Sequence, residues 1–173
     1  MINKIGVVAG SFDPITNGHM WLIRAALSIV DVVHVVIGQN PAKPGYFTHS
    51  ERERQVRSVL SDCLDPWDYD RIQVGECSGF LVEYASSVGA DCIIRGLRNT
   101  ADFLYEQQIQ AVNAKIRQGV NTIYLIPPSE YLEVSSSTVR GLVGVAGWES
   151  VVGQYVHPVI LGDLACRTEQ SRG

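Results

Sequence analysis

Apolar and polar positions follow two alternating patterns along this chain. Short runs rich in valine and isoleucine predict β-strands, and longer segments with apolar residues three or four positions apart predict α-helices between them. The predicted strands are residues 4–10, 31–38, 70–76, 91–95 and 121–127. The predicted helices are about residues 18–30, 49–63, 79–88 and 99–118. Several strands are apolar at nearly every position, which is typical of parallel strands covered on both faces.

The strand–helix alternation predicts an α/β fold: a doubly wound, Rossmann-like parallel sheet of five strands with helices on both faces. A chain of 173 residues that is 46% hydrophobic is large enough to bury one core, so we expect a single domain over residues 1–173. Within it we expect a C-terminal helical part at about 141–167 and a polar tail at 168–173.

Two of the predicted helices carry further signals. Thr48 followed by Glu51 matches a capping box at the start of the second helix. The fourth predicted helix has two faces. One is an apolar stripe, made of Tyr105, Ile109, Val112 and Ile116. The other is more polar and contains Asp102, Glu106, Ile109 and Asn113.

The composition of the chain disfavours nucleic acid and membranes as binding partners. Acidic residues outnumber basic ones by 18 to 14, and a net charge of −4 does not favour broad binding to nucleic acid. No apolar run reaches the roughly 18–20 residues of a membrane span, and no signal peptide is apparent. None of the four cysteines lies in a C-x-x-C pair. We therefore expect a cytoplasmic protein that binds neither nucleic acid nor membrane.

The segment AGSFDPITNGH, residues 9–19, joins the first predicted strand to the first helix. Gly10 permits a sharp turn, Ser11 supplies a hydroxyl, and His19 lies in the first turn of the helix, whose free N–H groups favour an anion. The alternative is an ordinary turn with a capping histidine. The phosphate-binding motifs G-x-G-x-x-G and G-x-x-x-x-G-K-[ST] are absent. The segment nevertheless lies at the sheet edge where open α/β sheets bind ligands, which favours a phosphate site.

Arginines follow the fourth predicted strand. Arg95 ends that strand and Arg98 follows three residues later, so the two guanidinium groups are candidates for a phosphate clamp. The alternative for Arg98 is a surface ion pair with Asp102, which contributes little.

Two further segments carry candidate phosphate-binding groups. Lys43 lies between prolines in residues 40–47, where the alternative is a solvated loop lysine. Ser135, Ser136 and Ser137 precede a predicted helix and can form a second anion site. The alternative for the serines is helix capping.

Together these segments resemble a known family. The string G-S-F-D-P-I-T-N-G-H resembles the signature of the nucleotidyltransferase superfamily. The strings RGLRNTADFLYE, NPAKPGYFT and SSSTVR are similar to those of the bacterial phosphopantetheine adenylyltransferase family, and the resemblance covers roughly residues 4 to 140. It implies transfer of the adenylyl group of ATP to 4′-phosphopantetheine, which gives dephospho-coenzyme A and pyrophosphate in coenzyme A biosynthesis. It also implies Mg²⁺ as cofactor, a homohexamer, and dephospho-coenzyme A or coenzyme A as product or feedback ligand.

The resemblance implies a role for each matching residue, and it implies no metal ligands in the protein. The catalytic residues would be His19, Lys43, Ser11 and Arg98. The ATP-binding residues would be Gly10, Ser11, Phe12, His19, Gly96, Arg98, Glu106, Tyr131, Ser135, Ser136 and Ser137. The residues that bind phosphopantetheine would be Ser11, Lys43, Gly79, Phe80, Leu81, Arg95 and Asn113.

The residues themselves point to chemistry on phosphates. No Cys-His pair and no Ser-His-Asp order is apparent, whereas arginine, lysine, histidine and hydroxyl groups suited to positioning phosphates are present. Three alternatives stay open. The first is a cytidylyltransferase, or an adenylyltransferase with another phosphorylated acceptor. The second is a nucleotide-binding protein without catalysis. The third is a nicotinamide-dependent oxidoreductase, which the missing G-x-G-x-x-G disfavours.

Overall fold

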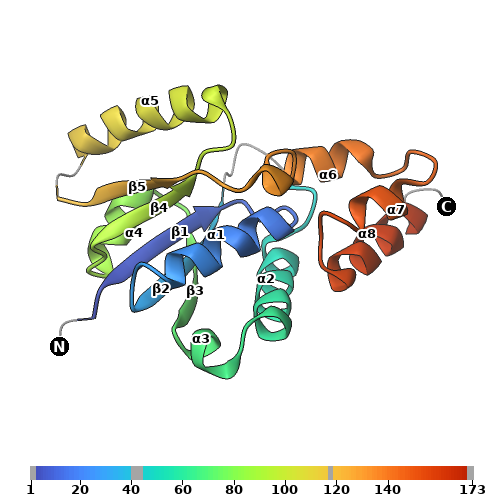
Figure 1. Ribbon diagram of the computed structural model, residues 1–173, viewed down its shortest axis with the longest axis horizontal. Coiled ribbons are helices and arrows are strands. Elements are labelled where there is room, and N and C mark those ends of the chain that lie inside the picture. The colour runs from blue at the N-terminus through green and yellow to red at the C-terminus, as the bar shows by residue number, and fades with distance from the viewer. Residues whose placement is uncertain (1–2, 40–44, 117–118, 171–173) are drawn as a thin grey trace.

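The computed structural model describes residues 3–39, 45–116 and 119–170. Strands and helices alternate along most of the chain, as the sequence predicts (Figure 1). In order, the elements are β1 (Ile5–Gly10), α1 (Asn17–Leu27), β2 (Val32–Gly38), α2 (His49–Cys63), α3 (Pro66–Asp70), β3 (Ile72–Cys77), α4 (Leu81–Ser87), β4 (Cys92–Gly96), α5 (Thr100–Ile116), β5 (Asn121–Leu125), the short 3₁₀ helix η1 (Ser129–Tyr131), α6 (Ser136–Leu142), α7 (Trp148–Val152) and α8 (Pro158–Gln170). None of the helices in these ranges has the length and apolar character needed to cross a membrane.

The five strands form one parallel sheet in the order β3-β2-β1-β4-β5. The chain runs outward from β1 to β3 and then crosses back to place β4 on the other side of β1. In this register Gly10 lies opposite Ile37 of β2, and Val8 lies opposite Ile94 of β4. The reversal creates a switch point between β1 and β4, which is where open α/β sheets bind ligands. The predicted doubly wound α/β fold is confirmed.

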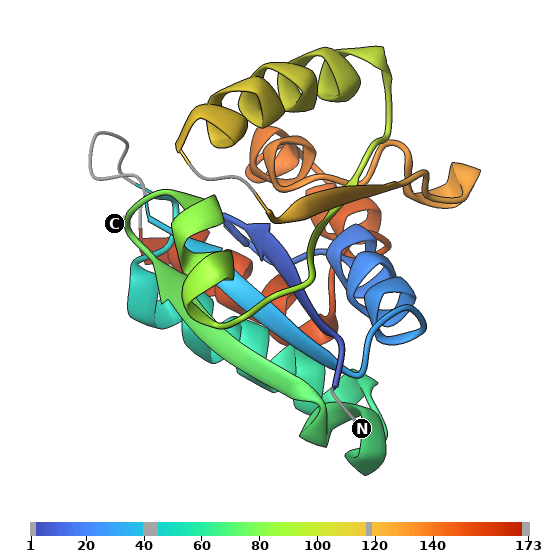
Figure 2. The same ribbon diagram turned by 90° about the vertical axis from the view of Figure 1, so that its left-hand side faces the viewer.

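Helices pack on both faces of this sheet (Figures 1 and 2). Val8 and Ile94 point into the larger core, with residues of α1, α2, α7 and α8. Their neighbours Val7 and Ile93 point the other way and pack with Ala85 of α4. Successive side chains of a strand alternate between faces, so apolar residues at consecutive positions serve both cores at once.

The apolar stripe predicted for helix α5 does not face a core. In Figure 1 the helix lies along the upper edge of the molecule, and Tyr105 and Val112 are exposed. In α5 only Glu106 is buried, and it lies on the more polar face. The physical reason is the neighbouring surface: Glu106 meets Arg95 at the end of β4. A carboxylate facing an arginine is a better partner there than an apolar side chain would be.

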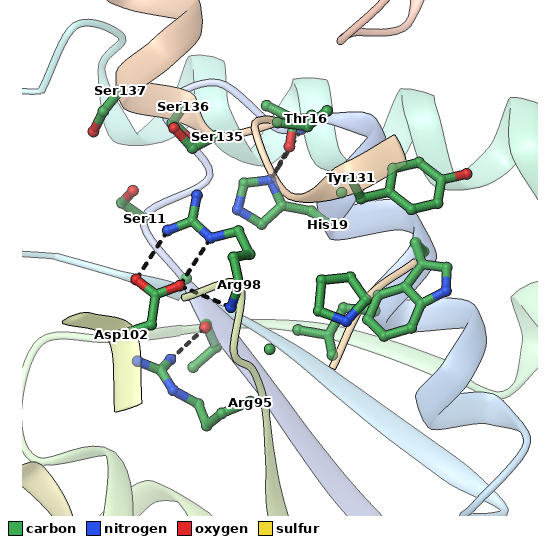
Figure 3. A pocket seen from close by; sticks show the side chains of 18 of the residues that line it. Ser11, Thr16, His19, Arg95, Arg98, Asp102, Tyr131, Ser135, Ser136 and Ser137 are labelled. Carbon is green, nitrogen blue, oxygen red and sulfur yellow. Dashed lines mark hydrogen bonds and ion pairs between the residues drawn. The ribbon is translucent and has the colours of Figure 1, made fainter. Parts of the chain in front are cut away.

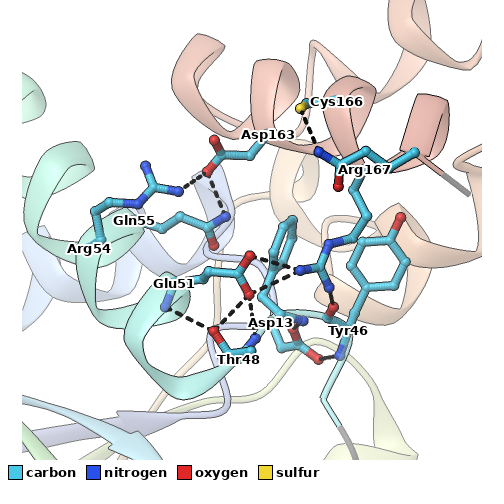
Figure 4. Close-up of polar contacts among 11 residues, drawn as sticks. Asp13, Tyr46, Thr48, Glu51, Arg54, Gln55, Asp163, Cys166 and Arg167 are labelled. Atoms are coloured by element: carbon cyan, nitrogen blue, oxygen red, sulfur yellow. Dashed lines mark hydrogen bonds and ion pairs between the residues drawn. The ribbon is translucent and has the colours of Figure 1, made fainter.

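The C-terminal tail is also different from the prediction. Helix α8 continues to Gln170, so residues 168–170 are helical rather than a frayed tail. Arg167 lies over the rings of Tyr46 and Phe47, at 5.5 and 4.7 Å from their centroids, and forms an ion pair with Glu51 at 2.7 Å (Figure 4). It also donates a hydrogen bond to the carbonyl of Tyr46. The polar end of the helix is therefore anchored by contacts with residues far away in the sequence.

The same glutamate confirms the predicted capping box of α2. The Glu51 carboxylate accepts the N–H of Thr48 at 2.7 Å, and the Thr48 hydroxyl accepts the N–H of Glu51 at 3.3 Å. Arg167 thus holds the start of α2 from the opposite end of the chain.

We expect Arg167→Ala to lower the free energy of unfolding by about 1–2 kcal/mol, since it removes an ion pair and two cation–π contacts. Urea denaturation of the two proteins measures the difference. Arg57→Ala is the matched control, because Arg57 pairs with Glu53 on an exposed helix surface and such a pair contributes only about 0.3–0.5 kcal/mol. Equal losses in the two variants would contradict the anchoring role of Arg167.

Candidate active site

A cavity of about 330 Å³ opens at the carboxyl ends of β1 and β4. Its walls come from the β1–α1 loop, α1, the end of β4, α5, and the segment that leads into α6 (Figure 3). Most of the residues predicted for the site line this cavity: Gly10, Ser11, His19, Arg95, Gly96, Arg98, Glu106, Tyr131, Ser135, Ser136 and Ser137. Three segments distant in sequence, within residues 9–22, 95–106 and 127–140, therefore converge at the switch point.

The orientation of His19 is fixed by Thr16, the residue that precedes α1. His19 Nδ1 lies 3.0 Å from the backbone nitrogen of Thr16 and 2.9 Å from its hydroxyl. A backbone N–H can only donate, so Nδ1 must be the unprotonated nitrogen of the ring. In the neutral imidazole the proton then lies on Nε2, which remains available as a donor. Phe12 packs against the ring, with centroids 4.9 Å apart.

The surroundings of His19 keep its imidazole neutral. Burial, which is the largest cause, and the positive charges of Arg98 and Arg95 together lower the pKa of His19 to about 4. At neutral pH the ring can therefore donate a hydrogen bond through Nε2–H without carrying a charge. A donor of this kind can stabilise an oxygen on which negative charge develops.

We expect an NMR titration of the His19 ring to have its midpoint near pH 4, and Arg98→Ala to move that midpoint upward, because one of the two positive charges is removed. The pKa is lower in the folded than in the unfolded state, so protonation disfavours folding. The contribution of His19 to stability is thus complete above pH 6.5 and is lost as the pH falls towards 4. A wild-type midpoint near 6.5 would contradict this description of the site.

Arg95 joins the sheet to α5. Its Nε donates to Glu106 Oε1 at 2.8 Å, and its Nη1 donates to the carbonyl of Ala9 at 2.7 Å. The Arg95 and Glu106 side chains are 25% and 10% exposed, so the pair lies at the inner wall of the cavity. These bonds fix α5 over the carboxyl ends of β1 and β4.

Arg98 forms an ion pair with Asp102, which was the alternative to a phosphate clamp in the sequence analysis. Its Nε lies 3.0 Å from Oδ2 and its Nη2 lies 3.2 Å from Oδ1, so the carboxylate is held at two points. Both side chains line the cavity, as Figure 3 shows. The pair therefore does not remove Arg98 from the site. It orients the guanidinium group at the cavity wall.

The serine triplet has divided roles. Ser135 caps α6 and accepts the N–H of Thr138 at 3.0 Å, so capping is the correct interpretation for this residue. The Ser136 hydroxyl donates to the carbonyl of Pro14 at 2.8 Å and ties the start of α6 to the β1–α1 loop. All three serines also line the cavity.

Sequence reasoning misses Arg140, which also lines the cavity. Arg140 donates to the carbonyl of Asp13, and its Nη1 lies 3.8 Å from the Asp13 carboxylate. The same carboxylate accepts the N–H groups of Tyr46 and Phe47, each at 2.8 Å. The available signal was an arginine one helical turn after the serine triplet, on the same face as Ser136.

A second missed arginine is Arg52 of α2, which is 8% exposed. Its Nη1 donates to the carbonyl of Ser11 at 2.7 Å and to that of Gly38 at 3.0 Å. It therefore links the loop after β1 to the end of β2 and holds the backbone of Ser11 in place.

Other predicted residues do not reach the cavity. Lys43 lies outside the described residues. Phe12 is fully buried and supports His19 instead of lining the site. The remaining members of the predicted phosphopantetheine set do not line it either: Gly79, Phe80, Leu81 and Asn113. Gly79 and Phe80 follow β3, which is separated from β1 by β2, and Leu81 begins α4 and packs against the core cluster on that face of the sheet.

Within the described ranges no group of three or more His, Cys, Asp or Glu side chains could hold a metal ion. The two carboxylates that line the cavity, those of Asp102 and Glu106, are paired with Arg98 and Arg95.

Comparison with known proteins identifies related families and proteins with a similar fold. The family described as cytidylyltransferase-like matches residues 7–142. A relative from Chromobacterium violaceum named phosphopantetheine adenylyltransferase is 44% identical over 168 residues, which is 96% of this chain and 99% of that protein. A relative of the same name from Alkaliphilus metalliredigens is 39% identical over 158 residues. These residues are 91% of this chain and 95% of that protein. In fold, the chain is similar to Plasmodium falciparum nicotinic acid mononucleotide adenylyltransferase complexed with NaAD, with a TM-score of 0.66 at 18% identity over 96% of both chains.

Proposed function

Because the chain belongs to the phosphopantetheine adenylyltransferase family, we propose that it transfers the adenylyl group of ATP to 4′-phosphopantetheine. The products are dephospho-coenzyme A and pyrophosphate, a step of coenzyme A biosynthesis. The observation that carries the proposal is the convergence of His19, Arg98 and Arg140 with serine hydroxyls in one cavity at the switch point. Such a set neutralises and positions phosphates.

The reaction is a direct displacement at the α-phosphorus of ATP. A phosphate oxygen of the acceptor attacks, a P–O bond forms, and the bond to pyrophosphate breaks. The acceptor phosphate is largely ionised at neutral pH, so it needs no general base. His19 is held by Thr16 rather than by a carboxylate, so it lacks the partner that would make it a strong base for a serine nucleophile.

Each group in the cavity has a role in this step. His19 donates its Nε2–H to an α-phosphate oxygen as negative charge develops on it. Arg98 and Arg140 neutralise the triphosphate, and the serine triplet offers hydroxyl donors to the β- and γ-phosphates. Ser11, together with Lys43, meets the acceptor phosphate.

The remaining assignments follow the family resemblance. Gly10, Gly96, Glu106 and Tyr131 contact ATP, with Glu106 near the ribose. Arg95 contacts phosphopantetheine, and its pantetheine arm follows Gly79, Phe80, Leu81 and Asn113. The bond between Arg95 and Glu106 couples the two substrate positions.

Mg²⁺ enters this site as part of the substrate. Mg²⁺ in nucleotide enzymes is held largely by phosphate oxygens and water. We therefore assign it to the ATP phosphates, where it neutralises charge on the pyrophosphate that leaves.

We also propose a homohexamer that works in the cytoplasm, with coenzyme A as a feedback ligand. The support for assembly is α5, on which Phe103, Leu104 and Tyr105 are each about half exposed. Burial of large apolar side chains between subunits would remove this surface from water. Light scattering coupled to gel filtration measures the mass, and a monomer would reject the hexamer.

A panel of substrates tests the activity. ATP and CTP are each combined with 4′-phosphopantetheine, nicotinate mononucleotide or a phosphorylated sugar alcohol, and products are identified by mass. The proposal requires dephospho-coenzyme A from ATP and 4′-phosphopantetheine as the dominant product. Preference for CTP would indicate a cytidylyltransferase, and preference for another acceptor a different adenylyltransferase. Nucleotide binding without any product would indicate a binding protein.

A further inference from the structure

The cavity has two chemically different ends. Cationic and hydroxyl side chains gather around His19, whereas the other end is apolar and aromatic. The side chains of that second end are Trp21, Leu22, Pro127, Tyr131 and Val134. Figure 3 shows Tyr131 on the far side of His19 from Ser11. None of the phosphate-binding groups described above comes from this end.

Trp21 belongs to α1 and lies one helical turn after Gly18. Its ring stacks with that of Tyr131, with centroids 6.3 Å apart and an interplanar angle of 30°. A Cβ at Gly18 would lie 3.2 Å from the carbonyl oxygen of Val134, so the glycine allows α1 to approach this segment closely. The close approach brings two aromatic rings from distant segments together in one wall.

A nucleoside triphosphate has two matching halves. Its phosphates suit the cationic end, and its base is a flat ring that stacks well on aromatic side chains. Trp21 is half-buried, so one part of its ring is already removed from water while another faces the cavity. An indole held in this way loses little freedom when a base stacks on it.

We propose that Trp21 contacts the base of the bound nucleotide and, with Tyr131, makes the site prefer base-bearing triphosphates over inorganic ones. This inference rests on the proposed function, since it takes ATP as the ligand. It adds a residue from α1 to the base-binding wall, beside the η1 segment.

Binding without turnover tests the proposal. Calorimetry measures the dissociation constants of Mg·ATP and Mg·tripolyphosphate for the wild type and for Trp21→Ala. Loss of one base-stacking ring typically costs about 5- to 100-fold in affinity, so we expect Kd for ATP to rise by that factor while Kd for tripolyphosphate stays unchanged. Trp21→Phe keeps an aromatic ring and should recover most of the ATP affinity.

Fluorescence gives a second readout and a matched control. The chain has three tryptophans, of which Trp67 on α3 is 75% exposed and Trp148 is 5% exposed. ATP should quench the wild type and Trp67→Phe alike, but should not quench Trp21→Phe. Tripolyphosphate should quench none of them.

Several results would overturn the assignment. These are equal losses of affinity for the two ligands, no loss for either, or quenching that survives in Trp21→Phe. A wild type that binds no ATP would overturn both this inference and the proposed function. A base-dependent effect of Trp21 in a protein that makes no dephospho-coenzyme A would leave the inference standing and reject the function alone.

Discussion

Replacing His19 with alanine is expected to lower kcat by about 10²–10³, the usual cost of losing one donor that acts on developing charge. The affinity for ATP should change much less, because the neutral imidazole donates most strongly when charge builds up on the α-phosphate. The structural basis is the fixed tautomer: Thr16 occupies Nδ1, so the proton lies on Nε2. Rapid-quench measurement of product formation, with ATP affinity from calorimetry, separates the two effects.

The control for this variant is His157→Ala, since His157 lies before α8 and does not line the cavity. It should keep full activity. Equal losses of ATP affinity and rate in His19→Ala would mean that His19 serves binding rather than the chemical step. The acid limb of the wild-type pH profile gives a further check, because His19 with its pKa of about 4 should not titrate between pH 6 and 8.

Replacing Arg98 with alanine is expected to raise Kd for ATP by about 10- to 100-fold, with a smaller effect on kcat. Hydrogen bonds to charged groups contribute about 1.5–3 kcal/mol, which corresponds to that range. Removal of Arg98 also leaves the Asp102 carboxylate in the cavity wall without its partner at 3.0 Å. That negative charge would then repel the phosphates and add to the loss.

A companion variant separates the two contributions. Asp102→Ala removes the carboxylate and keeps the guanidinium group, so it costs only the orientation of Arg98 and should weaken ATP binding less than Arg98→Ala does. Arg54→Ala is the matched control, because Arg54 pairs with Asp163 between α2 and α8, away from the cavity. Unchanged ATP affinity in Arg98→Ala would mean that the arginine is only a partner of Asp102.

The strand–helix order was predictable because parallel strands covered on both faces must be apolar at nearly every position. The structure differs from the prediction at the end of α8 and in the orientation of α5, and both differences depend on partners distant in the sequence. Arg167 is helical and anchored because Glu51, 116 residues earlier, lies beside it. Helix α5 turns Glu106 inward because Arg95 lies there, and apolar periodicity alone contains no information about the surface that a helix meets.

The site was predictable where a rule of topology applies. Loops after β1 and β4 must meet at the switch point, so Ser11, His19, Arg95 and Arg98 could be placed together from sequence. Arg140 could not be placed in this way, because its contact with Asp13 joins residues 127 positions apart.

Trp21 was missed for a related reason. Its apolar character is compatible with an ordinary core position of α1, and only the stack with Tyr131 places it at the cavity.

Release of pyrophosphate from Mg·ATP, with and without 4′-phosphopantetheine, tests the central claim of direct transfer most directly. Quenched time points would be analysed for pyrophosphate and, by mass, for dephospho-coenzyme A. The account predicts that the two products appear together in equal amounts, and only when both substrates are present. Release of pyrophosphate from ATP alone, in an amount equal to the enzyme, would reveal an adenylylated protein and contradict direct displacement.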